Sequence, residues 1–294
     1  MKKLLIIMVC LLPLIGANAQ EKKCEKDYLP KQGDWAIGID VVPILKYIGN
    51  AFNGNTDNRI DHLGGTPFIK GNSYFNNGLM PDVSISGKYL LTDEWALRAN
   101  LGLMIRSENW REYTADDKAL AANPLGDEKV IDKAHLMKNG MSLSLGAEYR
   151  KGTKRVQGVF GAGVLFAYQK NKTNYTWGNE MTMINQQPSA NSVWGGYSNG
   201  YRLLEKFGDA STFYTGITGS AGIEWFVAPK ISLGAEVNLT AYYVFQSKQY
   251  TKSEGYNAAL NKIEQRTDLT SPGDRSFVLG TESLGGSLNM TFYF

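Results

Sequence analysis

The sequence predicts an all-β protein, an eight-stranded antiparallel transmembrane up-and-down β-barrel, and three observations support this fold class. Eight segments alternate between apolar and polar side chains, as strands with one apolar face do. The connections between them alternate in length between short turns and long polar segments. The last of these strands ends the chain on the aromatic residue Phe294. We therefore expect short periplasmic turns at one end of the barrel and four long extracellular loops at the other.

The amino terminus has the form of a secretory signal peptide. Two lysines precede an apolar run from Leu4 to Ile15, and Ala17-Asn18-Ala19 follows as a cleavage site. The apolar run is too short to span a bilayer as a helix. We expect residues 1–19 to be the signal peptide, residues 20–33 a periplasmic lead starting at Gln20, and residues 34–294 the barrel.

The first strands are predicted from alternation that begins at Trp35. Trp35, Ile37, Ile39 and Val41 share one face of a strand over residues 35–42. Strands over 81–91 and 95–106 are joined by Thr92-Asp93-Glu94, which is short enough for a hairpin. The same arrangement gives two more hairpins, 141–149 with 156–168 and 213–225 with 231–245, and a last strand over 278–294.

Four long polar segments separate these strands, near positions 47–80, 107–138, 170–211 and 247–276. Connections of this length are unusual in a compact soluble domain but are typical of the extracellular side of a barrel. An even strand number then places both termini on the periplasmic side. Within the fourth loop, Tyr256–Gln265 is predicted to form a short surface helix.

Aromatic residues at outward positions fall near the two ends of the predicted strands, as two girdles at the membrane interfaces would require. The predicted periplasmic girdle consists of Trp35, Tyr89, Trp95, Tyr149, Trp225, Phe292 and Phe294. The predicted outer girdle consists of Tyr168, Phe213, Tyr243 and Phe245.

Over residues 34–294 this pattern resembles the small, eight-stranded outer-membrane barrels, the class of the OmpA membrane domain, OmpX, OmpW and the opacity proteins. The opening Gly33-Asp34-Trp35-Ala36-Ile37-Gly38-Ile39-Asp40 and the long loops resemble barrels of Bacteroidota in style. The resemblance implies a location in the cell outer membrane, in contact with its lipid. It also implies that Phe292 and Phe294 belong to the signal read by the barrel-assembly machinery.

Charged residues at inward positions predict a plugged lumen. Eight strands enclose an interior that side chains fill, which excludes a wide diffusion pore. Buried charges are tolerated when they are paired, so we expect an ion-pair network, with a path for protons or small ions as the alternative. The predicted network consists of Asp82, Lys88, Arg98, Arg106, Glu148, Arg150, Glu224 and Glu236.

The sequence carries no catalytic, cofactor or metal motif, and we predict a protein that is not an enzyme. Both histidines, His62 and His135, fall in predicted loops rather than beside a serine on a membrane strand. Loss of Lys2 and Lys3 with the signal peptide lowers the formal charge from +3 to about +1, which implies no nucleic-acid partner.

Cys24 is the one cysteine left after removal of the signal peptide, since Cys10 lies within it. An intrachain disulfide is therefore excluded. Two interpretations remain: a free thiol on a flexible lead, or an intermolecular disulfide to another envelope protein.

The third loop is the candidate partner-contact loop because it is unusually apolar, with Tyr175, Trp177, Trp194, Tyr197, Tyr201 and Phe207. Exposed aromatic residues on this scale mark a contact surface, or else the loop packs on itself over the barrel mouth. The preferred function is a structural or interaction scaffold acting through its loops, as an accessory subunit of a larger envelope complex. The alternatives are an OmpW-like passive transporter of small hydrophobic molecules and, last, a lipid-modifying enzyme.

Overall fold

The computed structural model describes residues 28–41, 84–152, 154–191, 194, 197–207, 211–279 and 284–294. The predicted signal peptide with its cleavage site, Cys24, His62, the first long loop and Asp82 lie outside the described residues. Among the described residues, no helix is long and apolar enough to cross a membrane.

Eight antiparallel strands form a closed ring, which confirms the predicted fold class. Strand β13 pairs with β1, with Ala36 opposite Tyr293, and this pairing closes the sheet. Elsewhere in the ring, each strand pairs with the next ring strand along the chain. Smaller strands lie in the sequence between β5 and β8 and between β9 and β13, but these ring strands still pair directly with each other. The ring consists of β1 (Trp35–Asp40), β2 (Ser84–Leu90), β3 (Trp95–Ala115), β4 (Lys129–Lys151), β5 (Val156–Thr176), β8 (Thr212–Ala228), β9 (Ile231–Gln246) and β13 (Leu284–Tyr293).

The wall separates an apolar outer face from a polar inner face because side chains alternate along each strand. In β1, Trp35, Ile37 and Ile39 are exposed while Ala36 and Asp40 are buried. Exposed apolar residues of this kind are the ones that a transmembrane barrel presents to lipid. At the end of the short turns, Phe294 packs on Trp35 with ring centroids 6.1 Å apart, and Trp95 packs on Tyr149 at 5.1 Å.

Glycine at inward positions allows the strands to bend tightly around the lumen. Gly146 on β4 lies opposite Gly163 on β5. A Cβ atom on Gly146 would overlap the carbonyl oxygen of Ala162, and one on Gly163 would overlap that of Leu145. Side chains are therefore excluded from both positions by the backbone of the neighbouring strand.

Three of the ring strands continue well beyond the barrel, so the prediction of a loop over 107–138 is wrong for most of that range. Strands β3 and β4 stay paired without a register shift as far as Ala115 and Lys129. A short helix, α4 (Asp117–Ala122), follows β3, and the Asp116 side chain caps its amino terminus. The parts of β3 and β4 beyond the barrel lack an apolar face, so the alternation that predicted the other strands is missing there. Backbone hydrogen bonds between the two strands hold them together without such a face.

The third and fourth long segments also contain strands. They are β6 (Tyr197–Ser198), β7 (Tyr201–Phe207), β10 (Gln249–Asn257), β11 (Lys262–Ser271) and β12 (Arg275–Val278). The helix predicted over Tyr256–Gln265 is wrong, because β10 and β11 form a hairpin there. Asn257 accepts hydrogen bonds from the backbone of Ala259 and Leu260, and Asn261 adopts a φ of 48°, which together make the turn.

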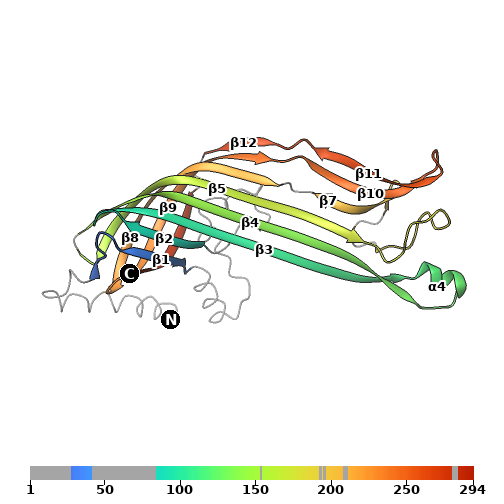
Figure 1. Cartoon of the computed structure of the whole chain (residues 1–294), viewed down its shortest axis with the longest axis horizontal. Coiled ribbons are helices and arrows are strands. Elements are labelled where there is room, and N and C mark those ends of the chain that lie inside the picture. The colour runs from blue at the N-terminus through green and yellow to red at the C-terminus, as the bar shows by residue number, and fades with distance from the viewer. Residues whose placement is uncertain are drawn as a thin grey trace, which may run out of the picture.

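The extended parts of β3, β4 and β5 combine with β7, β10 and β11 into one sheet, which we call the outer sheet. Its order is β11-β10-β7-β5-β4-β3. Figure 1 shows these strands extending from one end of the barrel as a long sheet, with α4 at its far end. The turns between strands and the carboxyl terminus lie at the opposite end.

Candidate functional site

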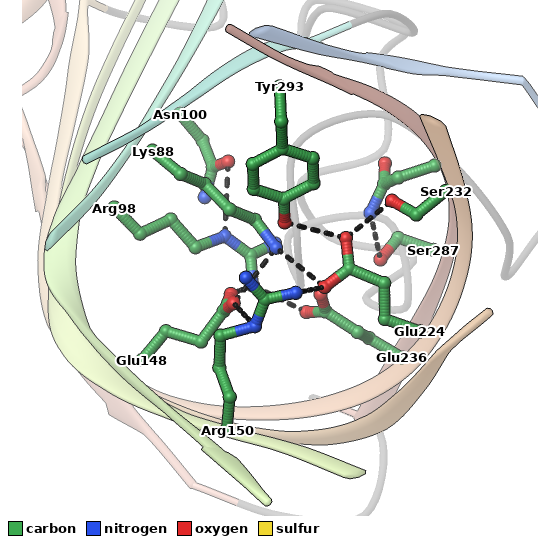
Figure 2. Close-up of polar contacts among 11 residues, drawn as sticks. Lys88, Arg98, Asn100, Glu148, Arg150, Glu224, Ser232, Glu236, Ser287 and Tyr293 are labelled. Carbon is green, nitrogen blue, oxygen red and sulfur yellow. Dashed lines mark hydrogen bonds and ion pairs between the residues drawn. The ribbon is translucent and has the colours of Figure 1, made fainter. Parts of the chain in front are cut away.

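Six charged side chains from five strands meet in the barrel lumen, and Figure 2 shows them pointing toward one another. Three are basic and three are acidic, so the group is neutral overall. Glu148, Arg150 and Glu224 are each at most 2% exposed. The group, which we call the lumen network, consists of Lys88 on β2, Arg98 on β3, Glu148 and Arg150 on β4, Glu224 on β8 and Glu236 on β9.

Every base in the lumen network contacts at least one acid. Lys88 Nζ lies 2.9 Å from Glu148 Oε1 and 3.7 Å from Glu224 Oε2. Arg98 Nη1 lies 2.6 Å from Glu236 Oε2 and 3.5 Å from Glu148 Oε2. Arg150 Nη2 donates to Glu224 Oε2 at 2.5 Å.

The strand register explains why acids from several strands are needed. Lys88 and Arg98 stand directly opposite each other on β2 and β3. Like charges in that position repel, so both depend on carboxylates that cross the lumen.

Two neutral groups and two aromatic rings complete the surroundings of Glu224 and Arg150. Ser232 Oγ and Tyr293 Oη donate to Glu224 Oε1 at 2.5 and 2.7 Å. The Arg150 guanidinium lies 5.2 Å from the ring centre of Tyr293 and 5.5 Å from that of Phe226. The sequence analysis did not assign Ser232, Tyr293 or Phe226 to this group. Each nevertheless stands at an inward position of its strand, β9, β13 and β8 respectively, which could have identified it.

Apolar and aromatic layers close the lumen on both sides of the network. Toward the short turns, Leu90, Phe226 and Tyr293 form a buried cluster with Ala36 and Ala96, against which Tyr28 and Leu29 pack. Toward the outer sheet, the buried cluster consists of Leu165, Ala167, Tyr214, Tyr242 and Val244.

Between these layers lies a cavity of about 30 Å³, bordered by Asn100, Ser144, Thr218 and Asn238 among others. A space of this size holds about one water molecule. The described side chains therefore fill the barrel and leave no wide path along it.

One of the residues predicted for the lumen network is not part of it. Arg106 lies where β3 leaves the barrel, is largely exposed, and pairs with Glu108 on the same strand. The sequence analysis included Arg106 because alternate residues of β3 keep facing the same side of the strand beyond the end of the barrel. Asp82 lies outside the described residues.

The third long segment folds back on the tip of the β3–β4 hairpin through buried polar groups. Asp132, which is 0% exposed, accepts hydrogen bonds from the backbone of Gly178 and Asn191, both at 2.8 Å. Residues 177–191, which we call the docked loop, are thus held at both ends by one carboxylate.

A second set of bonds joins the docked loop to helix α4. Asp117 Oδ2 accepts from Asn185 Nδ2 at 2.6 Å and from Ser189 N at 2.8 Å. Burial opposes ionisation of Asp117, but the hydrogen bonds from Ser189 and Asn185 outweigh it and lower the pKa of that carboxyl. Asn179 donates to the backbone oxygens of Ala115 and Ser189.

The six aromatic residues of the candidate partner-contact loop all make contacts within the chain. Trp177 Nε1 donates to the Leu203 oxygen at 2.7 Å, and its ring lies 6.0 Å from Tyr175 and 6.5 Å from Trp194. The buried Arg202 stacks on Trp177.

The other three aromatics bind neighbouring elements of the outer sheet. Tyr197 donates to the Pro188 oxygen, Tyr201 donates to Glu264, and Phe207 stacks on Tyr250 at 5.2 Å. These rings build the core of the outer sheet and docked loop, and their contact with a partner stays a prediction.

A cavity of about 850 Å³ lies at the tip of the outer sheet, between α4 and the docked loop. Its lining combines the polar Asp117, Asn179 and Asn185 with the apolar Leu120 and Ile184. Ile184 is 100% exposed, and Leu125 beyond α4 is 96% exposed. We call Leu125, Met183 and Ile184 the apolar tip.

A second hollow, of about 1000 Å³, lies on the barrel wall near the short turns. Trp35, Ile37, Tyr89, Leu97 and Leu145 border it. These side chains are exposed on the outer face. The inward residues Ala36, Lys88 and Arg98 border the same hollow.

The prediction that His135 falls in a loop is wrong. His135 lies within β4, because that strand extends past the barrel, and its Nε2 is 2.9 Å from Ser107 Oγ on β3. The pair is exposed on the outer face. Among the described hydrogen bonds none joins a carboxylate to His135, and no three described His, Cys, Asp or Glu side chains form a metal-binding group.

Comparisons with known proteins give one matching family and similar solved structures. The putative OmpA-OmpF-like porin family matches residues 69–269. No curated protein matches the chain. Among solved structures, the chain is similar to the outer membrane protein OprG from Pseudomonas aeruginosa, with 12% identity, a TM-score of 0.30, and coverage of 91% of this chain and 98% of OprG. It is also similar to a major outer membrane protein from Thermus thermophilus, with 11% identity, a TM-score of 0.34, and coverage of 89% and 99%.

Proposed function

The chain belongs to the putative OmpA-OmpF-like porin family, and from this premise we propose that it is a non-enzymatic outer-membrane scaffold that holds a protein partner on its extracellular outer sheet. The short turns then face the periplasm, and the outer sheet stands outside the cell. The observation that carries the proposal is the docked loop, which buried polar groups fix to the tip of the sheet.

A rigid platform lowers the entropy that binding must overcome. Asp132 holds both ends of the docked loop at 2.8 Å, and the buried Arg202 packs against the ring of Trp177, the first residue of the loop. The apolar tip lies beside this platform, and its Leu125 and Ile184 side chains are almost fully exposed. Exposed apolar side chains on a rigid support, next to a cavity, are typical of protein contact sites.

The filled lumen supports the same assignment. A scaffold needs a stable anchor in the membrane but no passage through it, and the lumen network with its apolar layers provides an anchor of this kind. The transport alternative needs a route for a hydrophobic molecule, and the hollow near Trp35 is bordered on its lumen side by Lys88 and Arg98, whose charges are held in the lumen network.

A photo-crosslinking amino acid at Ile184 tests the proposal in intact cells. We expect a discrete crosslinked protein that co-purifies in mild detergent, and its loss in Leu125→Lys, a fully exposed change that leaves the fold intact. The same crosslinker at Thr267 on β11 is the control. A chain that remains uncrosslinked at Ile184, or that crosslinks equally at Thr267, contradicts the proposal.

A lipid-modifying enzyme is the second candidate, and the Ser107–His135 pair favours it. A serine beside a histidine base can form a covalent acyl intermediate, provided that the histidine is oriented and the oxyanion is stabilised. If this candidate is correct, Ser107→Ala abolishes lipid turnover by the purified protein while gel mobility stays native. Under the scaffold proposal, neither the wild type nor the variant changes the lipid.

A further inference from the structure

A group of lysines surrounds a single carboxylate on the outward face of the outer sheet. Lys172 Nζ on β5 lies 3.2 Å from Glu205 Oε1, and Lys252 Nζ on β10 lies 3.5 Å from Glu205 Oε2. Tyr250 Oη donates to the same carboxylate at 2.6 Å. Lys170 Nζ lies 5.9 Å from the ring centre of Phe207. One acid thus fixes two lysines and leaves the group positive.

The group lies directly beyond the outer aromatic girdle. Along the outward face of β5, Tyr168 is followed by Lys170 and Lys172. Side chains on one face of a strand repeat every two residues, so the lysines lie about 7 and 14 Å past Tyr168. Tyr168 marks the headgroup level together with Phe213, its direct partner on β8.

Two more basic residues stand farther out on the same face. Arg111 lies directly opposite Lys133, both are exposed at outward positions, and Lys133 pairs with Thr176, which is four residues beyond Lys172 on β5. At about 27 Å past Tyr168 they are too distant to contact the same headgroup. We call Lys170, Lys172 and Lys252 the cationic band. Its three positive charges face the one negative charge of Glu205, which leaves a net charge of +2.

We propose that the cationic band binds the anionic phosphate of a lipid headgroup in the outer leaflet of the membrane. Lysine binds phosphate as a point charge, and lysines near a membrane surface attract anionic lipids. The stacked rings of Phe207 and Tyr250 lie between the lysines and offer an apolar surface to the less polar part of the headgroup. Continuity with the girdle favours a lipid occupant, because a lipid held there keeps its chains beside the apolar wall.

The proposal is tested with the full chain in nanodiscs of phosphatidylcholine that contain a minor fraction of phosphatidic acid. Lipid retained by the protein is measured by native mass spectrometry. We expect phosphatidic acid to be enriched around the wild type, and the enrichment to fall about 100-fold in Lys170→Gln/Lys172→Gln/Lys252→Gln, since each lysine near an anionic surface contributes a factor of about five.

A matched variant separates this site from general charge attraction. Lys129→Gln/Lys248→Gln/Lys262→Gln removes the same charge at exposed positions outside the band and is expected to retain the enrichment. Heat-modifiable gel mobility verifies folding of both variants. The proposal fails if the band variant keeps the enrichment, if both variants lose it equally, or if millimolar inorganic phosphate displaces the lipid completely, which would identify a site for free phosphate.

Discussion

Removing the charge of Glu224 is expected to destabilise the barrel more than any other single isosteric change in the lumen. Glu224→Gln leaves three positive charges facing two negative ones in a space without bulk water. At an effective dielectric constant of about 20, the lost attraction to Lys88 over 3.7 Å is about 4 kcal/mol. Measured losses for breaking one partner of a buried ion pair are about 3–5 kcal/mol, and we expect a loss in this range.

The assay is urea titration of the protein folded in lipid vesicles, with the folded fraction read from the gel mobility of unheated samples. Glu180→Gln is the control, since Glu180 is exposed and its ion pair with Lys118 spans 3.9 Å. The double variant Arg150→Met/Glu224→Leu restores charge balance and is expected to lose less stability than the sum of the single changes. A free energy of unfolding for Glu224→Gln within about 1 kcal/mol of the wild type would refute the reasoning.

Three further outcomes are expected. Asp132→Ala removes the acceptor of two backbone donors, so hydrogen exchange in residues 177–191 should accelerate while the barrel stays folded; Asp127→Ala, at an exposed position, should change nothing, and equal exchange in both variants would contradict the role of Asp132. Because its folded pKa is lowered, Asp117 contributes stability that is fully present above its unfolded value of about 3.8 and is lost as pH falls through the folded value. Exchange at the docked loop, corrected for intrinsic rates, should be equal at pH 7 and 5 and faster near pH 3; a rise already between pH 7 and 5 would exclude this carboxyl as the cause. Gly146→Ala should lower folding yield because its Cβ would overlap the Ala162 oxygen, whereas Gly219→Ala, which meets open space, should fold normally; equal yields would count against the clash.

The sequence predicted the barrel well because alternation of apolar and polar residues reports directly on a lipid-facing wall. The eight ring strands and the inward parity of Lys88, Arg98 and Glu224 follow from that alternation. The ends of the strands cannot be predicted from this alternation, because β3 and β4 carry no apolar residues that mark where they stop outside the membrane. Arg106 was assigned to the lumen for this reason.

Local chemistry decided the regions that the sequence misread. Ala258, Ala259 and Leu260 favour a helix by propensity, but Asn257 and Asn261 make a tight turn between β10 and β11. The docked loop depends on Asp132, whose partners lie 46 and 59 residues away. Contacts over such separations leave no periodic signal, so the order of the third loop became visible in the structure alone.

The claim that most needs a direct test is that the barrel is closed by its own side chains and that function lies in the outer sheet. Conductance of the purified full chain in a planar lipid bilayer at neutral pH measures directly whether the barrel is closed. We expect no steady conductance, because the lumen network and the layers around Phe226 and Tyr214 fill the interior. Stable unitary current steps from the wild-type protein would contradict the account.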